Sequence, residues 1–324
     1  MSYSVSILIC TRNRAAQLAE TLRALAAIDY DAPETTEILI VDNGSTDETA
    51  SVINAYCNGS VETSHLMEAR AGQTYARNRA ITEARGDILL WTDDDVKPSK
   101  NWIQAMCAPI ISGNADAVAG GILMAPHLRR SWMKGLHKIM LASTENFPEE
   151  APINLIGANM AFHRRVLEKV PSFDTELGPG QLGFQDDALF SRQLENAGYR
   201  ISRSLDICVE HHFAPDRLLR KNFLDRMIRE GKSEAYVAHH WEHRDLEDSW
   251  KYDVKEILLP LYRLLRPAKD DAEGGISARE MGWLKDLAFR SQMQIERTRP
   301  RNYEKFGLVK LNQSSADIPV AEKR

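Results

Sequence analysis

Three consecutive carboxylates, Asp93, Asp94 and Asp95, follow directly on an apolar run at residues 88–91. Four apolar residues in a row are typical of a strand that is buried on both faces, as in a parallel sheet covered by helices. Ligands of such sheets bind outside the carboxyl ends of the strands. The triplet therefore favours a hard divalent cation, Mg²⁺ or Mn²⁺, which takes oxygen ligands and completes its shell with substrate phosphates. A solvated acidic turn is the alternative interpretation of these residues alone.

Two further groups of residues could do chemistry. Asp186 and Asp187 begin a helix that the apolar spacing predicts to end at Gly198, and a glycine-rich loop at residues 177–183 precedes them. Acidic residues are favoured in the first turn of a helix by its dipole, so this position has an ordinary structural explanation. The other group is the histidine pair at residues 211–212, which has an equally ordinary alternative as surface histidines.

The elements that would position these residues alternate regularly along the first third of the chain. Apolar runs at residues 5–10, 37–41 and 61–67 predict strands, and residues 72–85 predict a helix ended by Gly86. Each strand leads into a polar turn, so residues 1–125 are predicted to form a parallel, doubly wound sheet. The polar turns would lie along one edge, where a nucleotide would bind.

The remainder of the chain gives a more mixed pattern. A strand is predicted at residues 117–123, a helix and loop at 127–150, and a glycine-led turn with a short strand at 157–166. A basic amphipathic helix is predicted to end at Gly231, followed by charged helices at 241–266 and 277–297. The polar tail from about Arg299 is expected to be poorly ordered.

Composition describes an ordinary globular protein of 324 residues, with 43% hydrophobic and 27% charged residues. The net charge of -5 gives no support for a nucleic-acid partner. Four cysteines without a C-x-x-C pairing indicate reduced thiols. No signal peptide or membrane-spanning run is recognisable, so we expect a cytoplasmic protein.

Taken together, the motifs resemble glycosyltransferase family 2, the inverting enzymes with the GT-A fold. The resemblance runs from Val5 to about Gly231 and rests on six segments in the family's order, namely residues 6–14, 38–47, 71–78, 93–95, 157–160, and Asp186 with residues 209–211. In one departure, Gln185 stands where the family usually has Glu before the Asp. This substitution leaves the Asp in place but removes the preceding carboxylate.

The resemblance implies a metal-dependent transfer of a sugar from a nucleotide-sugar donor, by the family's habit a UDP-sugar, to a hydroxyl of a saccharide or lipid-linked acceptor. The metal would stabilise the charge on the departing diphosphate, and a carboxylate would take the proton of the attacking hydroxyl. A domain at residues 1–235 is implied, with a nucleotide-sugar half at 1–125 and an acceptor half at 126–235. Residues 236–324 would be a helical extension.

For the metal, the resemblance implies Asp95 as a ligand, together with His211. An imidazole ligand favours Mn²⁺ over Mg²⁺. Asp93 would hold the ribose or belong to the metal shell, whereas Asp94 could face inward to structural donors.

Other positions match the family's donor site. Asp42 corresponds to the residue that recognises the nucleotide base, although a turn-forming Asp is the ordinary alternative. Thr11 and Arg14 lie in the loop that contacts the base, and Arg77 could bind the nucleotide or its phosphates. Asn159 would line the acceptor or donor-sugar pocket.

The catalytic base would be Asp186, with Asp187 as the second candidate. An ordinary Asp has a pKa of about 3.9 and is a weak base at neutral pH, so burial near the acceptor would have to raise it.

Two alternative functions and one question about the basic helix remain from the sequence. A nucleotidyltransferase would need a glycine-rich phosphate loop after the first strand, and residues 11–14 contain no glycine. An inactive relative that only binds nucleotide-sugars is suggested by Gln185. The basic helix at residues 217–229 could attach peripherally to the inner face of the membrane, or could serve as a lid or dimer surface; alternating charges at residues 244–255 favour ordinary solvation.

Overall fold

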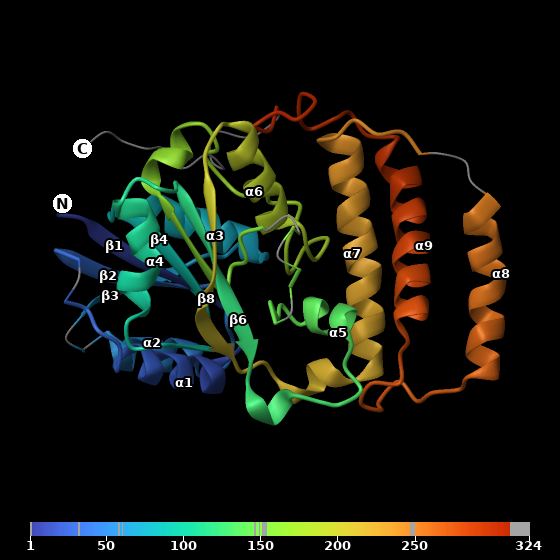
Figure 1. Ribbon diagram of the computed structural model, residues 1–324, viewed down its shortest axis with the longest axis horizontal. Coiled ribbons are helices and arrows are strands. Elements are labelled where there is room, and N and C mark those ends of the chain that lie inside the picture. The colour runs from blue at the N-terminus through green and yellow to red at the C-terminus, as the bar shows by residue number, and fades with distance from the viewer. Residues whose placement is uncertain are drawn as a thin grey trace.

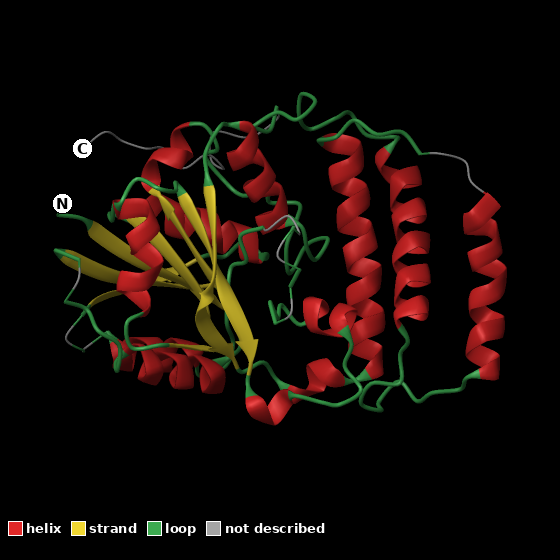
Figure 2. Ribbon diagram, in the orientation of Figure 1, coloured by secondary structure: helices red, strands yellow, loops and turns green. Residues whose placement is uncertain are grey.

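A mixed β-sheet flanked by helices forms the core of the fold, and three long helices stand beside it (Figure 1, Figure 2). The computed structural model describes residues 2–31, 33–57, 59, 61–145, 147–148, 150, 154–246 and 250–311. In this part of the chain the strands are β1 Ser4–Thr11, β2 Thr35–Asp42, β3 Glu62–Met67, β4 Ile88–Asp93, β5 Val96–Pro98, β6 Ala117–Met124, β7 Asn159–His163 and β8 Ile201–His211. The helices are α1 Ala15–Leu25, α2 Thr49–Tyr56, α3 Gln73–Glu83, α4 Trp102–Ile111, α5 Gly135–Met140, α6 Asp186–Asn196, α7 Arg220–His240, α8 Trp250–Leu265 and α9 Ala278–Glu296.

The sheet has the strand order β3-β2-β1-β4-β7-β6-β8-β5. β3, β2, β1 and β4 are parallel, β7 runs antiparallel to both β4 and β6, β6 and β8 are parallel, and β5 pairs antiparallel with β8. The predicted α/β class with a mostly parallel, doubly wound sheet is therefore confirmed.

Both faces of the sheet are covered, which explains the uninterrupted apolar runs of its central strands. Successive residues of β1 point to opposite sides, so Ile7 and Ile9 join the hydrophobic cluster beneath α1, α2 and α4. Leu8 belongs to the other cluster, which α3 and α6 cover with residues such as Ala80 and Phe190.

Strand register brings the sequence-predicted polar turns to one edge of the sheet. Thr11 at the end of β1 pairs with Asp42 at the end of β2, and the neighbouring Cys10 pairs with Asp93 at the end of β4. Because these strands are parallel, their carboxyl ends lie side by side. The edge that we expected to bind a nucleotide is thus assembled from three strand ends.

The predicted end of the basic helix at Gly231 is wrong, because α7 continues to His240 and packs along α9. Gly231 lies in the contact between these two helices, where an added Cβ would overlap the backbone oxygen of Lys285. The glycine therefore permits close helix approach and does not stop the helix. Residue 235, our expected domain boundary, falls within the same continuous helix.

Replacing Gly231 by Ala is expected to lower the free energy of unfolding by about 1–3 kcal/mol, because α9 must move to admit the methyl group. Gly282 in α9 is the matched control, since a Cβ there meets no atom within 4 Å. Gly282→Ala is expected to raise stability by about 0.5–1 kcal/mol through helix propensity. Urea unfolding of both variants measures the difference, and equal stabilities would contradict the close-contact explanation.

The tail is ordered as far as residue 311, contrary to our expectation of disorder from Arg299. Tyr303 is buried and donates a hydrogen bond of 2.8 Å to Asp174, and the Trp241 indole donates one of 2.8 Å to the carbonyl of Gly307. Residues 312–324 lie outside the described part. None of the helices within the described ranges is long and apolar enough to cross a membrane.

Candidate active site

A cavity of about 350 Å³ opens at the strand-end edge of the sheet. Asp94 and Asp95 are both buried in its wall, and Asp93 is partly buried. The lining also includes residues of the β1 turn, the β2 turn, the start of α3 and the glycine-rich loop, namely Thr11, Arg12, Arg14, Asn43, Gly72, Gln73, Pro179, Gly180 and Arg217. The structure thus unites six segments that are separated in the sequence.

Arg14 bridges two of the three carboxylates. One of its nitrogens, Nη1, lies 2.9 Å from Asp94 Oδ1 and 2.7 Å from Asp95 Oδ2. Thr11 Oγ1 donates a hydrogen bond of 2.7 Å to the other oxygen of Asp94. Asp94 is therefore held by protein groups, as the inward-facing alternative predicted, and burial raises its pKa to about 7 despite the nearby guanidinium of Arg14.

Asp95 and His211 lie next to each other where β5 pairs with β8. His211 ends β8, and its Nε2 lies 3.2 Å from Asp95 Oδ1, an atom that receives no hydrogen bond from the described residues. Arg217 Nη1 is 3.6 Å from Asp95 Oδ2. Although burial disfavours the charged form, His211 and Arg14 hold the pKa of Asp95 well below its usual range. A buried carboxylate is thereby kept ionised beside an imidazole.

This pair fits a divalent metal. Within the described ranges, no group of three or more His, Cys, Asp and Glu residues is arranged to hold one. Asp95 and His211 offer two ligands, however, and Mg²⁺ or Mn²⁺ bound with substrate phosphates needs only one or two from the protein. The buried Asp95 oxygen without a hydrogen bond is the kind of atom that a cation would satisfy.

The second acidic pair lies at the start of α6. Asp186 forms a buried ion pair with Arg77 of α3, and Gly157 leaves room for the guanidinium because a side chain there would overlap it. Arg77 is thus paired with a carboxylate and is not the solvated helix arginine considered as an alternative. Asp187 accepts a hydrogen bond of 3.3 Å from the backbone of Gly157. Burial and the neighbouring Asp186 raise the pKa of Asp187 to about 7.

Asp93 is influenced by charged residues of both sites. The charges of both Arg77 and His211 act on Asp93, which ends β4 between them, while burial and Asp95 raise its pKa. Asp93 is therefore influenced by both candidate metal ligands and by Arg77, the ion-pair partner of the candidate base.

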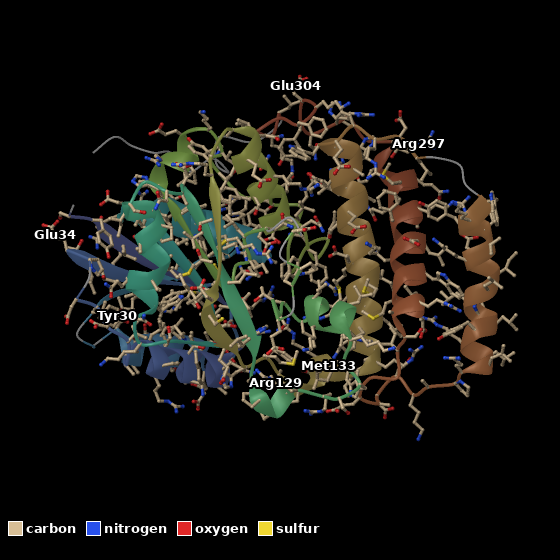
Figure 3. All side chains as sticks on the ribbon, viewed as in Figure 1. Tyr30, Glu34, Arg129, Met133, Arg297 and Glu304 are labelled. Carbon is tan, nitrogen blue, oxygen red and sulfur yellow. The ribbon has the colours of Figure 1, made fainter. Side chains whose placement is uncertain are left out.

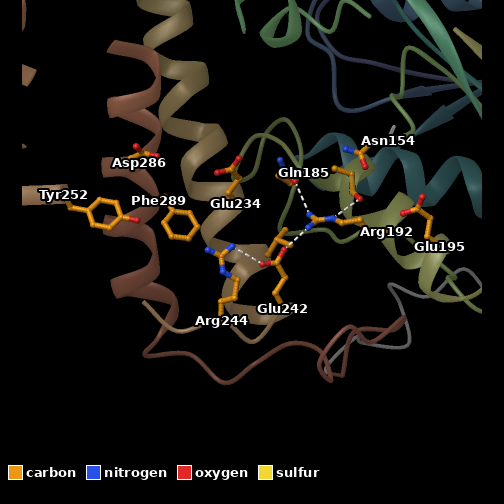
Figure 4. Close-up of a pocket in the computed structure, with 12 residues that line it drawn as sticks. Asn154, Gln185, Arg192, Glu195, Glu234, Glu242, Arg244, Tyr252, Asp286 and Phe289 are labelled. Carbon is orange, nitrogen blue, oxygen red and sulfur yellow. Dashed lines mark hydrogen bonds and ion pairs between the residues drawn. The ribbon is translucent and has the colours of Figure 1, made fainter. Parts of the chain in front are cut away.

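Gln185, at the position where the family usually has Glu, points into a different cavity. Its amide nitrogen donates a hydrogen bond of 2.7 Å to Glu230, and its oxygen accepts one of 3.2 Å from Arg192. Gln185 and Arg192 line a cavity of about 630 Å³ between α6 and the C-terminal helices (Figure 4). Asp186 and Asp187 do not line that cavity. The side chain of Gln185 therefore faces a different cavity from the Asp186–Arg77 ion pair.

The glycine-rich loop at residues 177–183 is docked on the start of α3. Gln73 donates a backbone hydrogen bond of 2.9 Å to Pro179, and the Gln181 amide donates one of 2.8 Å to the carbonyl of Ala71. Gly180 has a φ of 89° and lies so close to Gly72 that an added Cβ would be 3.0 Å from its Cα. The loop closes one wall of the strand-end cavity, a role that its glycines alone did not reveal.

Asp42 and Asn159, two residues predicted to bind the donor or acceptor, are hydrogen-bonded to other parts of the protein. Asp42 is buried and its Oδ1 accepts a hydrogen bond of 2.8 Å from Ser45 N, as in the turn alternative; its Oδ2 has no hydrogen bond from the described residues. Asn159 is completely buried, with its amide bonded to Trp102 Nε1 and to the carbonyls of Gly121 and Ile207. Asn159 therefore belongs to the core and not to the pocket surface.

The sequence reasoning missed Asn43. Its side chain bonds the carbonyls of Glu68 and Arg70 and the backbone nitrogen of Gly72, tying the β2 turn to the loop before α3. Asn43 directly follows a predicted strand, and this position alone could have indicated that it belongs to the ligand-binding end of the sheet.

Comparison with known proteins identifies the class. Residues 6–171, just over half of the chain, match the model of glycosyl transferase family 2. The chain belongs to this family: it is a glycosyltransferase, and its sheet is that of the GT-A fold. This membership decides against the nucleotidyltransferase alternative.

Individual relatives are distant. Glycosyltransferase AglE of Haloferax volcanii is 25% identical over 236 residues, which cover 72% of this chain and 73% of AglE. The glucosyl-dolichyl phosphate glucuronosyltransferase of the same organism is 26% identical over 182 residues, or 54% of this chain and 57% of the relative. Among solved structures, mannosyltransferase PcManGT from Pyrobaculum calidifontis, in complex with GDP-Man and Mn²⁺, aligns with a TM-score of 0.59 and 18% identity over 92% of this chain and 88% of that one.

Proposed function

We propose that this glycosyltransferase transfers a sugar from a nucleotide-sugar donor to an acceptor hydroxyl with inversion at the anomeric carbon. The donor would lie along the ends of β1, β2 and β4, in the cavity that Asp93 and Asp95 line. The observation that carries the proposal is that Asp95, which lines this cavity, lies 3.2 Å from the buried His211, while Asp186 lies behind the glycine-rich loop in its ion pair with Arg77.

Asp95 and His211 would hold a divalent cation, with Mn²⁺ favoured by the imidazole. Such an ion supplies electrostatic stabilisation of the departing nucleoside diphosphate. Arg14 and Arg217 contact or approach Asp95 and line the same cavity, so they add positive charge where diphosphate oxygens would lie. Thr11 fixes Asp94 and with it the turn that carries Asp95.

Asp186 would accept the proton of the attacking hydroxyl. The buried ion pair with Arg77 fixes the orientation of its carboxylate. A Cβ added at Gly178 would lie 3.1 Å from Asp186 Oδ2, so this carboxylate lies directly behind the loop that closes the cavity. Asp187 is the second candidate, because a pKa of about 7 suits general base catalysis near neutral pH.

The proposal also covers the nucleotide of the sugar donor and the class of the acceptor. The family's habit suggests UDP, whereas the PcManGT structure contains GDP-Man. The glucuronosyltransferase relative is named for a lipid-linked saccharide acceptor, which supports the same acceptor class here.

Calorimetric titration with UDP, GDP and TDP, each with Mn²⁺ and with EDTA, tests the proposal. One nucleotide should bind with Mn²⁺ and lose most of its affinity with EDTA, which would also identify the donor class for a sugar screen. Absence of metal-dependent binding for all three would contradict the proposed donor site.

A further inference from the structure

Helix α8 presents its apolar side outward. Six large apolar side chains of this one helix are exposed, and they account for nearly half of the thirteen in the described residues: Trp250, Ile257, Leu258, Leu261, Leu264 and Leu265. Their spacing of three, four and seven residues places them on one helix face. Four of them are at least 70% exposed. A surface helix normally turns such a face toward the protein core. In α8 the apolar face points toward the solvent instead.

The reversed orientation is fixed by polar contacts with α9. Arg263 lies 2.8 Å from Glu280, Arg290 lies 2.6 Å from Asp253, and Lys255 forms an ion pair with Asp286. Tyr262 and Ser277 share a hydrogen bond of 2.8 Å. In Figure 3, side chains of α8 also project away from α9, on the outer side of the molecule. Rotating the helix to bury its apolar face would break these contacts.

No described segment covers this face. Leu311, the last described residue, bonds the carbonyl of Asn302, and the preceding Lys310 is paired with Asp174 of the catalytic domain. The sequence after it, residues 312–324, is mostly polar and does not match an apolar stripe. Among the described residues, none occupies this face.

Charge distinguishes the candidate occupants. The chain has a net charge of -5, but α8 and the residue after it are more basic than acidic. The four basic side chains are Lys251, Lys255, Arg263 and Arg266, and the two acidic ones are Asp253 and Glu256. At 100° per residue, Lys251 and Arg266 fall on the same border of the apolar face, whereas Lys255 and Arg263 are paired with Asp286 and Glu280 of α9. Antiparallel pairing of two copies would place these basic borders against each other, whereas an anionic surface attracts them.

We propose that α8 is a membrane-surface helix that lies in the headgroup region of an anionic lipid bilayer. A tryptophan at its start, leucines and isoleucine on one face and basic residues at the border are the features of such helices. Sixteen residues span about 24 Å, too short to cross a hydrocarbon core of about 30 Å, so α8 lies along the surface. The basic helix α7 does not share this role, because its Arg220 is buried in an ion pair with Glu280 of α9.

Sedimentation of the full chain with vesicles tests the proposal independently of catalysis. Vesicles of phosphatidylglycerol with phosphatidylcholine should pellet the protein, and phosphatidylcholine alone should pellet much less. The double variant Ile257→Glu/Leu264→Glu is expected to bind the anionic vesicles at least about tenfold more weakly. The matched control is Ile295→Glu/Val309→Glu, which adds the same charge at exposed apolar positions outside α8 and should retain binding.

Circular dichroism and melting curves must first show that both double variants are folded. Failure of the wild-type chain to pellet with anionic vesicles, or equal loss in both double variants, would overturn the proposal. So would a concentration-dependent dimer in analytical ultracentrifugation that only the α8 variant abolishes, because a second copy would then cover the face.

Discussion

Asp186→Asn is expected to lower turnover by about two to four orders of magnitude, the usual contribution of a general base. Nucleotide binding should persist, because Asp186 does not line the strand-end cavity. The variant is also expected to be less stable by up to about 3–5 kcal/mol, since Arg77 loses the charge that compensates its burial. Initial rates, calorimetric nucleotide titration and thermal unfolding measure the three effects separately.

Asp187→Asn is the matched control, one residue further along α6. If Asp186 is the base, this variant should keep turnover within about tenfold of the wild type. A loss of turnover confined to Asp187→Asn would contradict the assignment and transfer the role to Asp187. Losses of similar size in both variants would show that the two carboxylates act as a unit.

The raised pKa of Asp187 also predicts a pH effect on stability. The folded state binds a proton at Asp187 more tightly than the unfolded chain does, so the associated stabilisation is complete below about pH 4 and is lost as the pH rises through about 7. Asp187→Asn should therefore be more stable than the wild type at pH 8, and this advantage should shrink as the pH falls toward 4. Melting temperatures across this range measure it; an advantage that grows at low pH would contradict the burial argument.

Asp95→Asn is expected to weaken Mn²⁺-dependent nucleotide binding by about two orders of magnitude or more, because it removes the charged member of the proposed ligand pair. His211→Ala should have the same direction of effect, with a smaller loss for Mg²⁺ than for Mn²⁺ because imidazole is the poorer Mg²⁺ ligand. Electron paramagnetic resonance of bound Mn²⁺ in the presence of nucleotide reports the site without relying on turnover.

The adjacent His212 supplies the control for this experiment. Its imidazole contacts Glu210 and not Asp95, although its backbone nitrogen donates to the Asp95 carbonyl. His212→Ala should therefore leave nucleotide affinity nearly unchanged. If both histidine variants lose binding equally, the loss reflects a disturbed strand end and the ligand assignment of His211 fails.

Local patterns were sufficient to predict the first half of the fold. Buried parallel strands require uninterrupted apolar runs, and the turns after them must be polar, so residues 5–10, 37–41 and 88–91 indicated both the sheet and its ligand-binding edge. The separated motifs, taken in order, also indicated the family that the comparison confirmed. Apolar runs, polar turns and motifs each depend on a few consecutive residues, so the sequence alone is enough to recognise them.

Contacts between distant segments were decided only by the tertiary structure. The sequence marked Arg14, Arg77 and Asn159 as ligand-binding candidates, but their packing partners, Asp94 with Asp95, Asp186, and Trp102, lie from 57 to 109 residues away. Whether a polar side chain faces a pocket or satisfies a buried neighbour depends on those partners. For the same reason Asn159 could not be recognised as a core residue from its motif.

The C-terminal helices show the same limit. A glycine within a helix pattern commonly marks an end, yet Gly231 is retained inside α7 because α9 approaches its backbone. Residues 241–266 were predicted only as a charged helix, and an apolar stripe such as the one on α8 would ordinarily face the core. Its outward orientation follows from ion pairs with α9, so the sequence determined the stripe and the packing of one helix on another decided which way it faces.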